Sequence, residues 1–391
     1  LSTLVSGGMS SLLARQLGAG DTDGAGATLA SAHGLALAIA ALVMIAFLCG
    51  GRAVAGQLSA SDPAIADMAF TYMAITVLAL PVQFALGLHA DTWRNEGRAG
   101  LVALLSVGVT LANIVLNYVL IGELGLGVAG SAWGTALAQV FGLGLLLWLR
   151  CRGQGIVPLQ ALRRHRWTGN WGRLAGLGAP LSLSFIGMAL VSSCVIVSLR
   201  LTAGADYADT IAAYGIVTRV LGFAFLPSMA FALALQSIAG NNWGAGLQGR
   251  ARSVLKIALL TALAYSLSME VIFLTGGTAI GSAFIGDPRV ITQVAGILHL
   301  MGLLYLFTGP VLSLALYFQA IGQPQKAGLL TLSKSFVLLP ALVAALAAAR
   351  GAQAIWFAFP LSDGLAVIMA VVLAIPVLKS APERPAYSPA Q

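Results

Sequence analysis

Eleven apolar stretches, each long enough to cross a lipid bilayer, constrain this chain more than any other feature of its sequence. A transmembrane helix needs about 20 mostly apolar residues, and in lipid its backbone polar groups must be satisfied within the segment. The stretches cover residues 1–17, 25–50, 64–90, 99–121, 126–149, 172–200, 209–238, 253–280, 290–319, 327–349 and 352–378. With 9% charged residues and a mean hydropathy of +0.91, such a chain cannot cover its surface in water. We therefore expect an all-α, polytopic membrane protein.

The basic residues predict how the chain is threaded. The formal net charge is +8, but Lys and Arg fall in short loops between apolar stretches, which is typical of membrane topology and not of nucleic-acid binding. If the spans alternate in direction, one side holds only Arg52, Arg200, Arg289 and Arg350. The other side is predicted to be cytoplasmic and holds Arg15, Arg94, Arg98, Arg150, Arg152, Arg163, Arg164, Arg166, Arg173, Arg250, Arg252, Lys256, Lys326, Lys334, Lys379 and Arg384.

Four short motifs occur twice in the same order, about 225 residues apart. The pairs are Gly18-Ala19-Gly20 with Gly244-Ala245-Gly246, Asp62-Pro63 with Asp287-Pro288, Trp93–Gly97 with Phe318–Gly322, and Gly127 with Gly351. Each motif alone is ordinary turn chemistry, but the constant order and spacing predict an internal repeat. A repeat of this length holds six helices of about 37 residues, and both Gly-Ala-Gly turns fall on the predicted cytoplasmic side, so the repeats run parallel.

The repeat predicts two pseudo-symmetric six-helix lobes. The helix with Pro180 opens the second repeat, and its counterpart would precede residue 1, so the first helix of the first lobe is expected to be missing. Two such lobes indicate a transporter with alternating access around a cavity between them. We expect a five-helix N-lobe over 1–150, a basic cytoplasmic inter-lobe loop over 151–171, a six-helix C-lobe over 172–378 and a disordered cytoplasmic tail over 379–391.

Several segments resemble the MATE (multidrug and toxic compound extrusion) family, within the broader multidrug/oligosaccharidyl-lipid/polysaccharide exporter superfamily. Ser10–Asp21 and Pro227–Gly246 resemble the ends of corresponding helices in its two lobes, and the order of the motifs is specific although each is degenerate. The other matching segments are Trp93–Gly97, Asn113–Ile121, Gly127–Trp133 and Phe318–Gly322. The resemblance implies two lobes and the exchange of H⁺ or Na⁺ for bulky amphipathic compounds, often cationic.

The sequence departs from the family at the positions that bind the coupling ion. One branch has an Asn-x-x-x-Asp pair where this chain has Asn113 and Asn117, together with an acidic residue in the missing first helix. Another branch has acidic residues in two helices where this chain has Met188 and a position near Thr308. The ligands of the coupling ion therefore cannot be carried over from the family.

Ionisable side chains deep in apolar stretches are rare and usually functional. Four of them lie about ten residues, or roughly 15 Å, from the outer end of a stretch, near the bilayer midplane; they are Arg219, Glu270, His299 and Asp363. We predict a polar cluster in the C-lobe with Glu270 or Asp363 as the protonatable group. The alternatives are a static Arg219–Glu270 ion pair and a structural role for His299.

Asn113 and Asn117 are the candidate polar site of the N-lobe. Residues four apart share a helix face, so both amides can act as neutral oxygen ligands for Na⁺ or bind a substrate. The alternative is that they only hold helices together. No metal or organic cofactor is expected, because Cys49, Cys151 and Cys194 have no metal-ligand spacing; the coupling ion is H⁺ or Na⁺.

The expected function is secondary active efflux by antiport, not enzymatic catalysis. The chain has no His-Glu-x-x-His, no Gly-x-Ser-x-Gly and no nucleotide-binding loop. The alternative is a flippase or exporter of a lipid-linked precursor, which usually has basic residues in its cavity; here Arg219 is the one midplane cation. We expect a monomer in the cell inner (plasma) membrane, with its C-terminus in the cytoplasm. The protein is expected to contact lipid and small amphipathic substrates but no nucleic acid.

Overall fold

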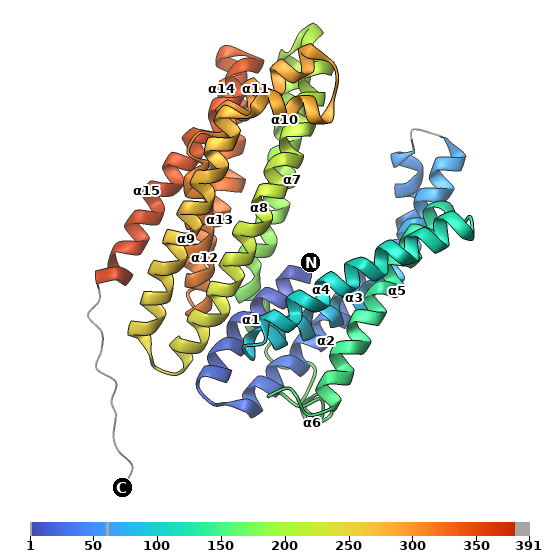
Figure 1. Cartoon of the computed structure of the whole chain (residues 1–391), viewed down its shortest axis with the longest axis vertical. Helices are drawn as coiled ribbons and strands as arrows, with labels where there is room; N and C mark the ends of the chain where they lie inside the picture. The colour runs from blue at the N-terminus through green and yellow to red at the C-terminus, as the bar shows by residue number, and fades with distance from the viewer. Residues whose placement is uncertain (1, 60–61, 380–391) are drawn as a thin grey trace. The chain divides into compact units, whose positions relative to one another are not determined.

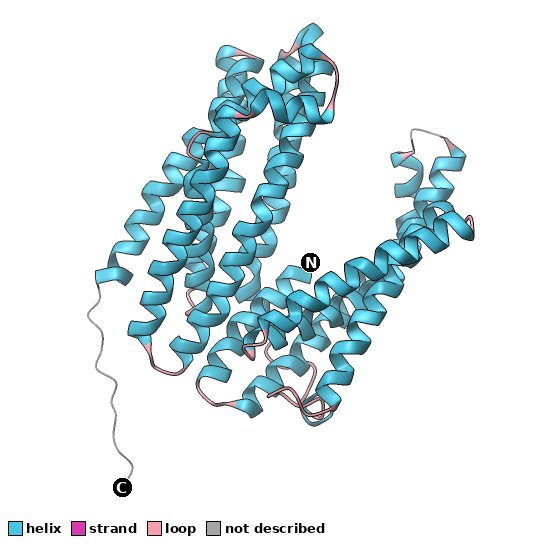
Figure 2. Cartoon of the chain, in the orientation of Figure 1, coloured by secondary structure: helices cyan, strands magenta, loops and turns pink. Residues whose placement is uncertain are grey.

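The computed structural model describes residues 2–59 and 62–379, and within them the chain consists of helices and loops (Figure 2). Nine helical segments of this part are long and apolar enough to cross a bilayer, and one bent pair would make a tenth. The expected all-α, polytopic fold is confirmed. The tail that we expected to be disordered falls almost entirely on residues 380–391, outside the described residues.

The first compact unit covers Leu1–Gly178. In this unit α3 packs against α2 and α5, and α1 packs against α2 and α3. Met9, Leu13, Leu29 and Leu88 are fully buried at the centre of its main apolar core. Its elements are α1 (Ser2–Gly18), α2 (Thr22–Leu58), α3 (Pro63–Asn95), α4 (Ala99–Asn117), the π turn η1 (Tyr118–Glu123), α5 (Gly127–Cys151), α6 (Ala161–Arg164) and the start of α7 (Trp171–Thr202) (Figure 1).

The second unit covers Ala179–Gln391. Here α8 packs against α9, α11 and α12, and α12 also packs against α9 and α13. After α7 its elements are η2 (Gly204–Asp206), α8 (Tyr207–Gly244), α9 (Gln248–Thr275), α10 (Gly277–Phe284), α11 (Pro288–Gly302), η3 (Tyr305–Phe307), α12 (Thr308–Ala320), α13 (Pro324–Leu332), the π turn η4 (Ser333–Leu338), α14 (Leu339–Arg350), η5 (Ala352–Phe357) and α15 (Ala358–Lys379) (Figure 1).

The division between the units falls inside α7, just before Pro180, and not in the loop over 151–171 where we expected it. The loop is part of the first unit because its side chains pack there. Val157 is fully buried in the apolar core of that unit, and the indole of Trp171 donates a hydrogen bond to the carbonyl of Ser31 over 3.1 Å. Proline is tolerated inside a membrane helix, and here the Ser184 hydroxyl donates a hydrogen bond to the carbonyl of Pro180.

The repeated motifs adopt the same local conformation in both units. Asp62 and Asp287 each cap the helix that follows, α3 and α11, by accepting hydrogen bonds from backbone N–H groups. In both cases the next residue is proline at the first helical position, where the missing N–H has no cost. Gly20 and Gly246 end α1 and α8 with φ of 75° and 74°, a conformation that favours glycine. The repeat that we read from the sequence thus has a conformational basis.

The stretch 290–319 is not one helix. It breaks after α11, where Leu304 adopts a left-handed conformation with φ of 65°, and continues through η3 into α12 with a bend of 50°. The helix after Pro324 is also irregular, because η4 interrupts it with a π turn between α13 and α14. Hydropathy gives no sign of either irregularity. Both occur in the second unit, beside the pocket described next.

Candidate functional site

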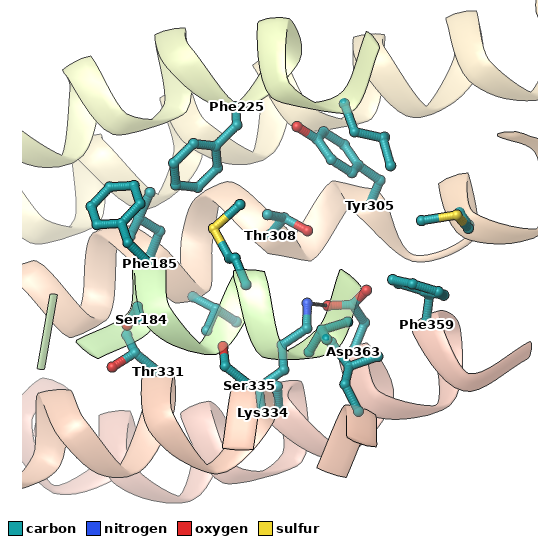
Figure 3. A pocket seen from close by; sticks show the side chains of 18 of the residues that line it. Ser184, Phe185, Phe225, Tyr305, Thr308, Thr331, Lys334, Ser335, Phe359 and Asp363 are labelled. Carbon is teal, nitrogen blue, oxygen red and sulfur yellow. Dashed lines mark hydrogen bonds and ion pairs between the residues drawn. The ribbon is translucent and has the colours of Figure 1, made fainter. Parts of the chain in front are cut away.

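A cavity of about 330 Å³ lies inside the second unit. Residues from α7, α8, the α11–α12 break, the α13–α14 helix and α15 line it, so the cavity depends on packing of segments far apart in the sequence. Phe185, Phe225 and Phe359, which Figure 3 labels, give it a mostly apolar wall together with Met188 and Met301. Methionine side chains are flexible and can adapt to ligands of different shape.

An ion pair interrupts this apolar wall. The ammonium of Lys334, on η4, donates to a carboxylate oxygen of Asp363, on α15, and both side chains face the cavity (Figure 3). The Asp363 side chain is 10% exposed and that of Lys334 is 24% exposed. A charged pair in a membrane-spanning segment is costly and is usually retained for function. Asp363 was among the candidates from the sequence.

Lys334 lies inside a helical segment and not with the basic residues near the cytoplasmic surface, where the charge pattern predicted it. Pro324 is at the start of α13, so Lys334 lies about ten residues, or roughly 15 Å, along the helix that continues into α14. Counting from that proline, and not from the edge of the apolar stretch, would have placed this lysine at the depth of the other candidates.

The π turn η4 holds Lys334 at this position. A π turn inside a longer helix is rare, often lies at a functional site, and here leaves Lys334 and Ser335 on the cavity wall. Gly187 lets α7 and η4 pack closely, because a Cβ at this glycine would come within 2.4 Å of the Ser335 Cβ. A side chain at residue 187 would therefore push η4 away from α7.

Hydroxyl groups complete the polar lining of the cavity. They include those of Ser184, Thr218, Tyr305, Thr308 and Thr331, four of which are labelled in Figure 3. The Tyr305 hydroxyl is buried and makes no hydrogen bond among the described residues. Met188 and Thr308 line the same cavity. One branch of the resembled family has an acidic residue at the position of Met188 and another near that of Thr308. Asp363 supplies the carboxylate from a different helix.

The other three candidates of the C-lobe do not join Asp363 in one cluster. Glu270, on α9, accepts hydrogen bonds from the backbone N–H groups of Leu304 and Leu306 over 3.2 and 2.7 Å. It is buried but does not line the cavity. Arg219 and His299 are exposed side chains on α8 and α11. The static Arg219–Glu270 ion pair that we considered is absent from the described part of the chain.

The two N-lobe amides are joined to each other and to a neighbouring helix. The side-chain amide of Asn117 donates to the Asn113 carbonyl oxygen over 3.3 Å, and the Asn113 amide donates to the Thr135 hydroxyl over 3.2 Å. Gly134 makes room for the Asn117 oxygen, which a Cβ there would approach within 2.1 Å. These contacts join α4 to α5. Among the described residues, no group of three or more His, Cys, Asp or Glu could hold a metal ion.

Taken together, the multi-span helical fold and the ion pair within its spans define a polytopic helical membrane protein. The sequence model of the MatE family matches residues 1–119 and 184–346. The chain therefore belongs to the MatE family, as the sequence motifs predicted. Since members of this family are transporters, the expectation that the chain is not an enzyme agrees with its membership.

Curated relatives and solved structures extend this result. The chain is similar to multidrug and toxin extrusion protein 1 of Danio rerio, with 24% identity over 63% of this chain and 41% of the relative. It is also similar to multidrug resistance protein PmpM of Pseudomonas aeruginosa, with 25% identity over 73% of this chain and 60% of the relative. In these comparisons the chain spans about two fifths to three fifths of the relatives' length.

The fold is similar to a structure described as the outward-facing conformation of a multidrug resistance MATE family transporter of the MOP superfamily. The TM-score is 0.87 at 20% identity, and the match covers 97% of this chain and 85% of that one. At this identity the likeness concerns the fold alone.

Proposed function

We propose that this chain exports amphipathic compounds by ion-coupled antiport, and that the cavity of the second unit binds both compound and coupling ion. The observation that carries the proposal is the Lys334–Asp363 ion pair, because it places an exchangeable carboxylate on the wall of an apolar cavity within the membrane-spanning segments. The names of the relatives, which refer to multidrug extrusion and multidrug resistance, support the compound class.

Asp363 can satisfy its charge with one positive partner at a time. In the structure that partner is the Lys334 ammonium. A proton on Asp363 would remove the charge and release Lys334, and a cationic compound would have to displace the ammonium. Proton and compound thereby compete for one carboxylate, and this competition is the requirement for antiport. A ligand that binds one state of the transporter better than the other shifts the equilibrium between them.

The nature of the site favours H⁺ over Na⁺ as the coupling ion. A sodium ion needs several oxygen ligands and would face the positive charge of Lys334, which already occupies Asp363. Proton transfer needs only the carboxylate. The Asn113–Asn117 pair in the first unit offers neutral oxygens, and its amides already bond to each other and to Thr135. We assign the coupling role to Asp363 for this reason.

Lys334 also bears on the flippase alternative. A transporter of lipid-linked phosphates needs unpaired positive charge in its cavity. Among the residues that line the described cavity, Lys334 carries the positive charge. Because Asp363 neutralises it, the pair adds no net charge to the cavity. This arrangement suits an amphipathic compound better than a phosphate-rich one. We further propose that the chain works as a monomer in the inner (plasma) membrane with its C-terminus in the cytoplasm.

The test is compound transport by the full chain in lipid vesicles. A proton gradient, a sodium gradient or no gradient is imposed, and accumulation of ethidium is followed by fluorescence. We expect accumulation with the proton gradient alone and none in Asp363→Asn, with His299→Gln as a matched control at an exposed intramembrane position. Undiminished transport by Asp363→Asn would refute the assignment of the site. Transport that follows the sodium gradient would refute the choice of ion, and no transport of ethidium under any gradient would refute the proposed function.

A further inference from the structure

The break between α11 and α12 leaves backbone N–H groups without helical partners. α11 ends at Gly302 and Leu304 is left-handed, so the N–H groups of Leu304 and Leu306 do not have the carbonyl partners of a regular α-helix, whereas those of Phe307 and Thr308 bond to Leu304 and Tyr305. In a lipid environment water does not replace these bonds, so another group of the protein must accept them.

Glu270 accepts two of these bonds. One carboxylate oxygen accepts from the N–H of Leu304 over 3.2 Å and the other accepts from the N–H of Leu306 over 2.7 Å. The residue is 8% exposed. Hydrogen bonds to an ionised acceptor are stronger than neutral ones, and they gain further in a region of low dielectric constant. A left-handed leucine is a strained conformation that persists only where its surroundings hold it.

The same face of α9 fits the break at two further levels. Residues 262, 266, 270 and 273 are three or four apart and therefore lie on one side of the helix. Toward the C-terminal end of α9, the Phe273 ring packs against the Tyr305 ring with centroids 5.1 Å apart, and a Cβ at Gly302 would come within 3.0 Å of the Phe273 Cβ. On the other side of Glu270, a Cβ at Gly309 would come within 2.5 Å of the Ser266 hydroxyl oxygen.

The segment that Glu270 holds forms part of the cavity wall. Met301, Tyr305 and Thr308 line the cavity, the last two labelled in Figure 3, whereas Glu270 is not among the lining residues. From these contacts we propose that Glu270 is a positioning residue: its carboxylate fixes the break between α11 and α12 and thereby sets which compounds fit against Tyr305 and Thr308. The role in compound selection rests on the proposed function, but the role at the break does not.

This role differs from that of the protonatable group in the antiport cycle. Glu270 contacts backbone N–H groups that remain in place whichever compound is bound, whereas Asp363 faces the cavity and pairs with a side chain. Loss of the Glu270 carboxylate should therefore change the affinity for compounds more than the dependence on the gradient. Loss of the Asp363 carboxylate should abolish the dependence on the gradient and also weaken the binding of a cationic compound.

The first experiment measures the break directly. Hydrogen exchange of the peptide over 303–309 is compared by mass spectrometry in wild type, Glu270→Gln and Glu270→Ala, each in lipid nanodiscs. Gln offers one acceptor oxygen and Ala none, so we expect exchange to become several-fold faster in Gln and at least about tenfold faster in Ala. His299→Gln, one turn before the break, and Asp363→Asn serve as controls with unchanged exchange. Equal exchange in wild type and Glu270→Ala would overturn the proposal.

The second experiment measures selection of compounds. In vesicles, we expect Glu270→Gln to raise the KM for ethidium roughly fivefold while kcat changes less than twofold, since only the wall of the cavity moves. The double variant with Tyr305→Phe should show less than the sum of the two single effects if Glu270 acts through this segment. An additive double variant, or a fall in kcat at unchanged KM, would overturn the role in selection. Faster exchange at the break in a chain that moves no ethidium would support the positioning role and refute the proposed function instead.

Discussion

The Glu96–Arg150 ion pair of the first unit and the Lys334–Asp363 ion pair of the second differ in what surrounds them. Glu96 and Arg150 are each 1% exposed and lie 2.8 Å apart. Both also bond to the backbone of Val157, and the Arg150 guanidinium lies 4.7 Å from the centroid of the Trp93 ring. Lys334 and Asp363 bond to each other on the wall of a cavity.

The comparison shows how the same chemistry can fasten a fold or serve a ligand. The first pair ties the loop after α5 to the end of α3, and neither of its residues lines the described cavity. Breaking it would leave a buried charge without a partner. The second pair lines the cavity, and the proposed function requires it to exchange partners with a proton or a ligand there. The expectation is that variants of the first pair lower stability and variants of the second lower transport.

The largest expected effect is on transport. Asp363→Asn should reduce proton-driven ethidium transport about 100-fold or to background, because coupling by a protonatable group is lost. The amount of folded protein and its unfolding temperature in detergent should stay close to those of wild type. If Asp363→Asn lowered the unfolding temperature as much as loss of the Glu96–Arg150 pair does, the second pair would also stabilise the fold, and the two pairs would not differ in role.

The next effect is on stability. Arg150→Met should lower the free energy of unfolding by about 3–5 kcal/mol, since it leaves the Glu96 carboxylate buried and unpaired. Denaturation in detergent, followed by the yield of folded protein, would show this. Arg52→Met is the matched control, because its ion pair with Asp67 is more than 70% exposed on both sides and should be worth less than about 1 kcal/mol. Arg150→Met as stable as Arg52→Met would contradict the fastening role.

A smaller effect is expected on the affinity for compounds. Lys334→Met removes the ammonium that a cationic compound must displace, so the Kd for ethidium should fall up to tenfold, or about 1.4 kcal/mol. Tryptophan or ethidium fluorescence during titration measures this. Lys326→Met, two turns earlier in the same helix and outside the cavity lining, should leave the Kd unchanged. Weaker binding in Lys334→Met would mean that the ammonium contacts the compound itself.

The smallest effects are expected at the exposed positions that the sequence also suggested. Arg219→Gln and His299→Gln should each change the transport rate by less than about twofold, because neither side chain lines the cavity. The unfolding temperature should change by less than about 2 °C, because substitutions of exposed side chains rarely change the free energy of unfolding by more than about 0.5 kcal/mol. A large loss of transport in either variant would extend the functional site beyond the cavity and blur its contrast with the first unit.

Features that depend on neighbours in sequence could be predicted. The helix caps at Asp62 and Asp287 and the left-handed conformations of Gly20 and Gly246 follow from local chemistry. The repeat could therefore be predicted from the sequence alone. Asp363 could be found because charge deep in an apolar stretch is rare. The family followed from the order of the motifs.

Features that depend on packing could not. The left-handed Leu304 has no local signal, because leucine disfavours this conformation and only contacts with α9 hold it there. For the same reason Glu270 was grouped with Arg219 by depth, although its partners are backbone groups of the α11–α12 segment. Lys334 was missed because the apolar stretch does not show where the helix begins.

The π turn at Ser333–Leu338 makes the site sensitive to the length of the chain. A π turn holds about one residue more than an α turn, and each residue rotates a helix by roughly 100°. Deleting one residue here would restore a regular helix with the same end points and the same hydropathy, yet it would turn Lys334 away from Asp363. A homologue with one residue fewer between α13 and α14 would therefore be expected to lack the Lys334–Asp363 ion pair. This would hold even if the rest of its sequence aligned with this chain.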